Sequence, residues 1–209
     1  MFQGWASALC CLMLLATTAS AQNPPPPPSP QFSSILQAQQ HRDAVIDAAK
    51  HSTTWIRHGC QSGSFTPLPV VKVWKRPEFD ATNRPIAGLW GERVEASGCG
   101  ITRLLNVATS VRSPGALVTG ILAPGDTGAD PTMQMDASRY AFTAAVSPGC
   151  QQAYLDDTHA VRKEKADDPR VNGPVSVEDW TVVACGRTVV VEVKFIPTAN
   201  GTTVVAHAL

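Results

Sequence analysis

Four cysteines constrain the fold of this 209-residue chain more than any other feature: Cys60, Cys99, Cys150 and Cys185. An even number of cysteines in an exported chain indicates a disulfide framework. The alternative is a four-thiolate zinc site, but zinc ribbons use close C-x2-C pairs, and these cysteines are widely spaced. Three pairings are open on sequence alone. We expect Cys60–Cys99 and Cys150–Cys185, because each then connects the end of a helix to a strand within one half of the chain.

Export is predicted by the N-terminal segment, residues 1–21, which is apolar and ends in Ala19-Ser20-Ala21. This layout is typical of a signal peptide with cleavage before Gln22, although no Lys or Arg lies near the start. A lipoprotein is the alternative, but a bulky Leu9 precedes Cys10 where a small residue is needed. Residues 22–32 contain five consecutive prolines and are interpreted as a stiff spacer, or as a ligand for an aromatic groove.

The charge balance excludes some classes of partner, because the chain has 17 basic and 17 acidic residues. A nucleic-acid-binding protein needs a basic excess, and an anionic membrane surface attracts a polybasic segment. After residue 21 no segment is long and apolar enough to span a bilayer. We therefore expect a periplasmic or secreted protein with no cofactor and no nucleic-acid partner, and with no transmembrane segment once the signal is cleaved.

The pattern along residues 33–209 predicts an α+β domain. Helices are expected over 33–57, ended by Gly59, and from Asp130-Pro131 to Pro148-Gly149. Residues 113–130 and 162–170 are expected to be loops. Val189, Val191, Val193 and Phe195 alternate with more polar residues and predict the buried face of a strand, followed by an Asn200-Gly201 turn. Shorter strands are expected at 71–74, 93–96, 102–107, 181–184 and 202–206.

The two halves of the chain show related patterns, which suggest an internal repeat with half-units 33–112 and 129–209. Each half has a helix, then Gly-Cys, then a stretch that contains a tryptophan, then Cys-Gly. The expected fold is therefore two helix-plus-β-hairpin units, sharing an antiparallel or mixed sheet and carrying one disulfide each. Chance recurrence of Gly-Cys and Cys-Gly is the alternative.

The stretch from Glu178-Asp179-Trp180 through Cys185-Gly186 to Val-Glu-Val-Lys-Phe195-Ile-Pro197 resembles the C-terminal module of uncharacterised bacterial exported proteins. Residues 123–131 and 133–136 are also similar to that group. The resemblance covers about the last 90 residues. It implies secretion and a bacterial envelope setting, and it implies no catalytic residue, since the group has no established activity.

No motif defines a catalytic site. The nucleophile elbow G-x-S-x-G and the H-E-x-x-H motif are absent. Asp47 with His51 could bind a metal but is more typical of a surface ion pair, so no metal site is predicted. The paired carboxylates 156–157 and 167–168, and the acidic loop 126–130, are more typical of solvated loops and of a helix cap. Trp74, Trp90 and Trp180 are the candidate ligand-contact residues; the alternative for each is the core.

These observations lead us to expect a non-enzymatic exported protein of the bacterial cell envelope that binds an envelope protein or glycan. An envelope hydrolase with a carboxylate and histidine site assembled from separated residues is the alternative. A pocket that holds two carboxylates, or a carboxylate and a histidine, within reach of each other would favour the hydrolase. A third hypothesis is that an uncovered edge at residues 202–206 adds to another protein's sheet.

Overall fold

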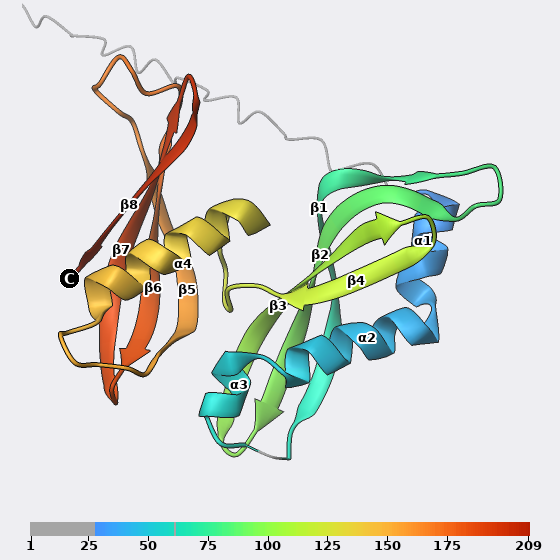
Figure 1. Ribbon diagram of the computed structural model, residues 1–209, viewed down its shortest axis with the longest axis horizontal. Helices are drawn as coiled ribbons and strands as arrows, with labels where there is room; N and C mark the ends of the chain where they lie inside the picture. The colour runs from blue at the N-terminus through green and yellow to red at the C-terminus, as the bar shows by residue number, and fades with distance from the viewer. Residues whose placement is uncertain (1–27, 61) are drawn as a thin grey trace, which may run out of the picture.

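The computed structural model describes residues 28–60 and 62–209; the predicted signal peptide and most of the proline run lie outside them. The described chain forms two units, each a helical segment followed by a four-stranded antiparallel sheet (Figure 1). The first unit comprises α1 (Pro30–Gln37), α2 (Gln39–Lys50), α3 (Thr53–Arg57), β1 (Ser64–Phe79), β2 (Pro85–Gly98), β3 (Ile101–Ser113) and β4 (Ala116–Ile121). The second comprises α4 (Pro131–Ala145), β5 (Ala153–Glu164), β6 (Val175–Ala184), β7 (Arg187–Thr198) and β8 (Gly201–Ala208).

The α+β class and both disulfides are confirmed, but the expected shared sheet is not what the structure shows. The strands form two separate sheets, in the orders β1-β2-β3-β4 and β5-β6-β7-β8. Each unit also has four strands in place of a single hairpin. Residues 113–130 were expected to be a loop, yet they contain β4, because Gly115 with a φ of 78° turns the chain back onto β3. The first unit consequently extends beyond residue 112.

The long N-terminal helix of the prediction is three helices. Ala38 has an extended backbone (ψ 131°) and separates α1 from α2, and nothing in the structure explains this break. The break before α3 has a clear cause, since the Ser52 side chain accepts a hydrogen bond from the Trp55 amide and so starts a new helix. The α4 prediction is confirmed, because Asp130 caps the helix and Pro131 occupies its first turn.

Each sheet buries one face against the helices of its own unit. In the first unit, Val45 and Ala49 of α2 pack on Val94, Leu105 and Val107. In the second, the small residues of α4 let the helix approach a core that contains Trp180, Val191, Val193 and Phe195; these small residues are Ala137, Ala141 and Ala145. The predicted buried face is thereby confirmed for Val191, Val193 and Phe195, whereas Val189 is partly buried at the edge of the same core.

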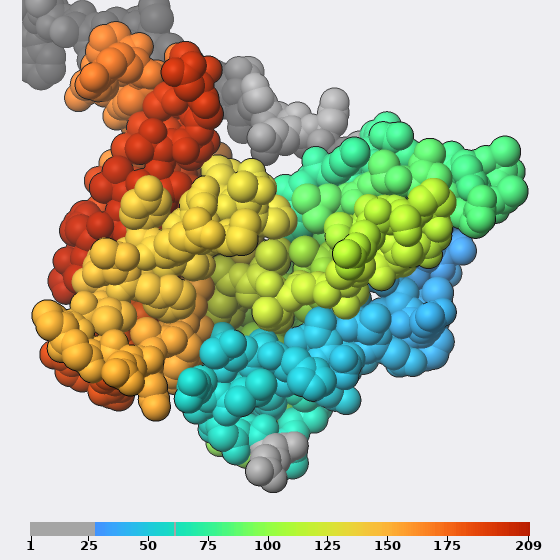
Figure 2. All heavy atoms as spheres, in the orientation of Figure 1, coloured from blue at the N-terminus to red at the C-terminus, as the bar shows by residue number. Residues whose placement is uncertain are grey.

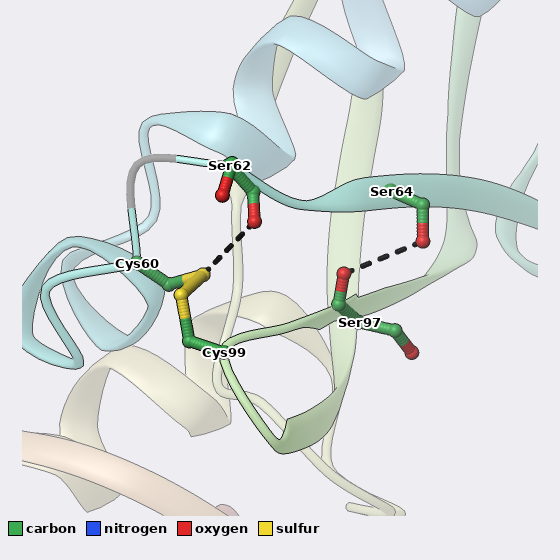
Figure 3. Close-up of a disulfide and its surroundings, with 5 residues drawn as sticks. All are labelled: Cys60, Ser62, Ser64, Ser97 and Cys99. Carbon is green, nitrogen blue, oxygen red and sulfur yellow. Dashed lines mark hydrogen bonds between the residues drawn. A yellow bond between two sulfur atoms is a disulfide. The ribbon is translucent and has the colours of Figure 1, made fainter.

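The two disulfides occupy matching places in the two units. Cys60–Cys99 joins the segment after α3 to the β2–β3 turn (Figure 3), and Cys150–Cys185 joins the segment after α4 to the β6–β7 turn. Both turns are two-residue Cys-Gly loops with positive φ at each residue: 51° and 78° at residues 99 and 100, and 49° and 78° at residues 185 and 186. Such turns match the twist of paired strands and need a left-handed backbone at both positions, which cysteine seldom adopts.

A candidate binding groove between the two units

The linker between β4 and α4 is held by both units. The Asn106 side-chain amide of β3 donates hydrogen bonds to the carbonyl oxygens of Ala123 (2.7 Å) and Gly125 (2.9 Å). On the other side, the Thr158 hydroxyl of β5 donates to the carbonyl of Pro124 at 2.5 Å. Asp126 also exchanges backbone hydrogen bonds with β5. The linker is therefore a fixed part of the junction between the units.

Side chains also join the units directly, at the start of β5. The Asp156 carboxylate lies 2.6 Å from Nε2 of His58 and accepts a hydrogen bond of 2.9 Å from Nη2 of Arg103. The Thr54 hydroxyl of α3 donates to the carbonyl of Leu155 at 2.7 Å. His58, Arg103 and Thr54 belong to the first unit, so these contacts fix α3 and β3 against the second.

A groove of about 620 Å³ lies at this junction. It is contributed by α3, the end of β4, the linker, α4 and the start of β5, and Figure 2 shows a recess where α3, β4 and α4 meet. The residues that line it share one property, the absence of charge: Ser52, Thr53, Thr54, Ile121, Leu122, Ala123, Pro124, Pro131, Thr132, Gln134, Met135, Ser138, Phe142, Ala153, Tyr154 and Leu155.

Most of the polar side chains in this lining already have hydrogen-bond partners within the protein. Gln134 accepts from the Ala123 amide and donates to the Ala129 carbonyl. The Ser138 hydroxyl donates to the backbone of its own helix, and Ser52 caps α3. Since these groups are bonded within the protein, the groove presents a mostly apolar surface to a ligand; the hydroxyls of Thr53, Thr132 and Tyr154 are its polar groups without a bond to a residue that the structure describes.

Charged groups gather at one end of the groove, around Tyr154. The Tyr154 ring lies 6.3 Å from the His58 ring, centroid to centroid, and Arg103 and Asp156 lie beside it. Burial raises the pKa of the Tyr154 hydroxyl, and the Asp156 carboxylate raises it further, while Arg103 and Arg57 act in the opposite direction. An uncharged groove therefore opens beside a charged cluster.

A smaller cavity of about 160 Å³ shares Leu122 and Gln134 with the groove and is lined by Trp74, one of the candidate ligand-contact residues. The Trp74 ring packs on Gly91 so closely that a Cβ there would lie 2.5 Å from it. The Lys72 ammonium lies 5.4 Å from the centre of this ring and donates to the Gly128 carbonyl. Burial of that ammonium lowers the pKa of Lys72, and nearby Glu178 partly offsets the effect.

Trp90 and Trp180, the other two candidates, are core residues here, and each has 0% exposure. Their burial requires a partner for the indole N–H, and a buried glutamate supplies it in both units. Trp90 donates to Glu92 at 3.1 Å, and Trp180 donates to Glu178 at 2.9 Å. In this conformation neither tryptophan reaches a ligand.

These two glutamates are not among the candidates predicted from the sequence, although the sequence contains a signal for them. Glu92 and Glu178 each lie seven positions before the second cysteine of their unit. Their remaining contacts differ, because Glu92 lies 2.6 Å from Nε2 of His41, whereas Glu178 accepts from the Gly128 amide at 2.8 Å. The shared position supplies the same function in both cores, which is to accept the indole proton.

The other sequence candidates are dispersed. Asp47 and His51 form an exposed pair, and Asp130 caps α4. The adjacent carboxylates of Asp156 and Asp157 have separate partners, since Asp157 lies 3.0 Å from Nε2 of His159. Within residues 28–60 and 62–209 no group of three His, Cys, Asp or Glu side chains could hold a metal ion.

None of the helices in this described part combines the length and the apolar character needed to cross a bilayer. Comparison with known proteins finds no matching family model, no matching curated protein and no matching solved structure. The fold and the groove therefore carry the functional argument, and the resemblance to bacterial exported proteins stays a prediction.

Proposed function

We propose that this chain is a non-enzymatic exported protein of the bacterial cell envelope, and that it binds an envelope component through the groove between its two units. The observation that carries the proposal is the groove of about 620 Å³ with an uncharged lining. Its volume falls within the usual range for small-molecule sites, roughly 300–1,000 Å³. The two disulfides support an oxidising compartment, where such bonds persist.

The lining favours an apolar group on the partner over a glycan. Sugar hydroxyls need polar groups that are still free to bond, whereas Gln134, Ser138, Ser52 and Thr54 already bond within the protein. Apolar contact is favourable by about 25 cal/mol for each Å² removed from water. The proposed partner therefore presents an apolar segment to the groove.

Nile red, an uncharged dye that fluoresces in apolar surroundings, tests this proposal on the full chain with its disulfides intact. We expect saturable binding that Met135→Glu abolishes, because the substitution places a charge in the lining. Ile56→Glu is the matched control, since Ile56 and Met135 are both 57% exposed but only Met135 lines the groove. Equal loss of binding in both variants, or no saturable binding at all, would contradict the proposal.

We further propose that the two units arose by internal duplication. Three features support it: the common order of helix and four-stranded sheet, the Cys-Gly turn in the middle of each sheet, and the glutamate seven positions before that turn's cysteine. The tryptophan that bonds to the glutamate lies two positions before it in the first unit and two after it in the second. In both units the glutamate therefore accepts the indole N–H of a buried tryptophan, although the tryptophan occupies a different position relative to the glutamate.

An envelope hydrolase is the second candidate, and two histidine–carboxylate pairs favour it. His58 and Asp156 lie 2.6 Å apart at the end of the groove, but Arg103 also holds this carboxylate. His41 and Glu92 are also 2.6 Å apart, and Glu92 lines the smaller cavity. However, His41 is 5% and Glu92 8% exposed, and the same glutamate oxygen also accepts from Trp90. These contacts fit a role in the core. Hydrolysis of p-nitrophenyl butyrate that is lost in His41→Gln, with unchanged thermal stability, would support the enzyme instead.

A further inference from the structure

The charged end of the groove narrows the chemistry of the ligand. Tyr154 lines this end of the groove, and Arg103 pairs with Asp156, two residues further along β5. Arg57 lies one turn of α3 after Thr54, which also lines the groove, so the two residues share one side of the helix. One carboxylate, that of Asp156, opposes the two arginines, and it is already held by Arg103 and His58. The guanidinium of Arg57 has no salt bridge with any residue that the structure describes. The groove end thus has an excess of positive charge.

The interior of the groove favours a hydrocarbon chain over a peptide. A peptide brings an amide donor and a carbonyl acceptor with every residue, and burying them without partners is costly. Of the polar side chains in the lining, Gln134 has both its amide groups bonded within the protein, and the hydroxyls of Thr54 and Ser138 are likewise bonded. A hydrocarbon chain makes no such demand and gains from every methylene that leaves water.

From these two observations we infer that the groove binds one acyl chain of an anionic amphiphile, with the chain along the uncharged lining and the acidic head beside Arg57. The inference rests on the proposed function and names the ligand class of the same groove. The proposed ligand is a fatty acid or another lipid that carries an acyl chain. Preferential binding of an apolar peptide is one of the results that the experiment below distinguishes.

The test is displacement of Nile red from the full chain by three amphiphiles below their micelle concentrations: dodecanoate, dodecyltrimethylammonium and an uncharged dodecyl ester. We expect dodecanoate to compete best. Arg57→Ala should weaken dodecanoate binding about two- to five-fold, as for one exposed ion pair, leave the uncharged probe unchanged and not weaken the cationic probe. Arg57→Lys should restore most of the loss, because it keeps the charge.

Arg112→Ala is the matched control, since Arg112 is an exposed arginine near the far end of β3, roughly 30 Å of strand from Arg103. Equal competition by all three amphiphiles, equal effects of the two arginine variants, or stronger competition by a capped apolar peptide would each overturn the inference. In each of these cases the full chain would still bind Nile red, and Met135→Glu would still abolish that binding. Failure of the acyl-chain inference is thereby separated from failure of the groove itself.

Discussion

Replacement of Glu178 by alanine is the most direct test of how the second core is held. The carboxylate is 2% exposed and accepts two hydrogen bonds, from the Trp180 indole at 2.9 Å and from the Gly128 amide at 2.8 Å. Trp180 has no exposed area, so bulk solvent does not reach its indole N–H. An orphaned buried donor costs about 1–3 kcal/mol, and the lost bond to Gly128 with the vacated volume adds a similar amount. We expect Glu178→Ala to lower the free energy of unfolding by about 3–5 kcal/mol.

Urea unfolding followed by circular dichroism measures this loss, and Glu95→Ala is the control, because Glu95 is exposed and its removal should change stability by less than about 0.5 kcal/mol. The double variant Glu178→Ala, Trp180→Phe removes the acceptor together with its donor. It should therefore be more stable than the sum of the single changes predicts, by about 1–3 kcal/mol. A loss under about 1 kcal/mol for Glu178→Ala, or strict additivity in the double variant, would refute the reasoning.

Three further predictions concern other parts of the molecule. Replacing both Cys150 and Cys185 by alanine should lower the free energy of unfolding by about 4 kcal/mol, because the disulfide closes a loop of 35 residues in the unfolded chain. Urea unfolding under non-reducing conditions measures this change, and a loss below about 1 kcal/mol would contradict the loop-entropy argument. Hydrogen bonds from the Arg170 side chain and amide lower the pKa of Asp168 from 3.8 to about 2. The ionised Asp168 therefore stabilises the fold fully above the unfolded pKa, and this stabilisation disappears as the pH falls through about 2. An NMR titration of the carboxyl group with a midpoint near 3.8 would exclude the lowered pKa. Thr54→Val should lower the free energy of unfolding by about 1 kcal/mol, because it removes a hydrogen bond between the units; unchanged stability in urea unfolding would show that this contact does not hold the units together.

The sequence predicted the elements whose local signals are strong. The Asp130-Pro131 start of α4, the alternating buried residues around Val191 and the within-half disulfides are all confirmed. The cap and the two-residue period depend on residues close together in the chain and need little knowledge of tertiary contacts. The disulfides join residues 39 and 35 positions apart, and their pairing was predicted from the repeated Gly-Cys and Cys-Gly pattern of the two halves.

The elements that were missed depend on contacts that the sequence does not display. β5 contains the run Arg162-Lys163-Glu164, which was expected to be a loop. It is a strand because these residues pair with Val175–Val177 of β6, and Arg162 also forms ion pairs with Glu164 of its own strand and Glu192 of β7. β4 was missed because its six residues depend on pairing with β3.

The groove could not be predicted either. Its lining comes from segments about a hundred positions apart, such as Thr54 and Leu155, which meet only when the two units pack. No charged residue contributes to the lining, so the lining contains none of the charged residues by which a catalytic motif is recognised in a sequence. The buried glutamates were within reach of sequence reasoning, since Glu92 and Glu178 hold the same position relative to Cys99 and Cys185.

The disulfide arrangement has a consequence for how the chain matures. With the N-terminal segment removed as proposed, each bridge joins two cysteines that are consecutive in the chain, Cys60 with Cys99 and Cys150 with Cys185. A chain that emerges from its N-terminus into an oxidising space can therefore close the first bridge before the third cysteine appears. An oxidant that joins thiols in order of emergence would reach the native pattern without reshuffling, so maturation would not need a disulfide isomerase.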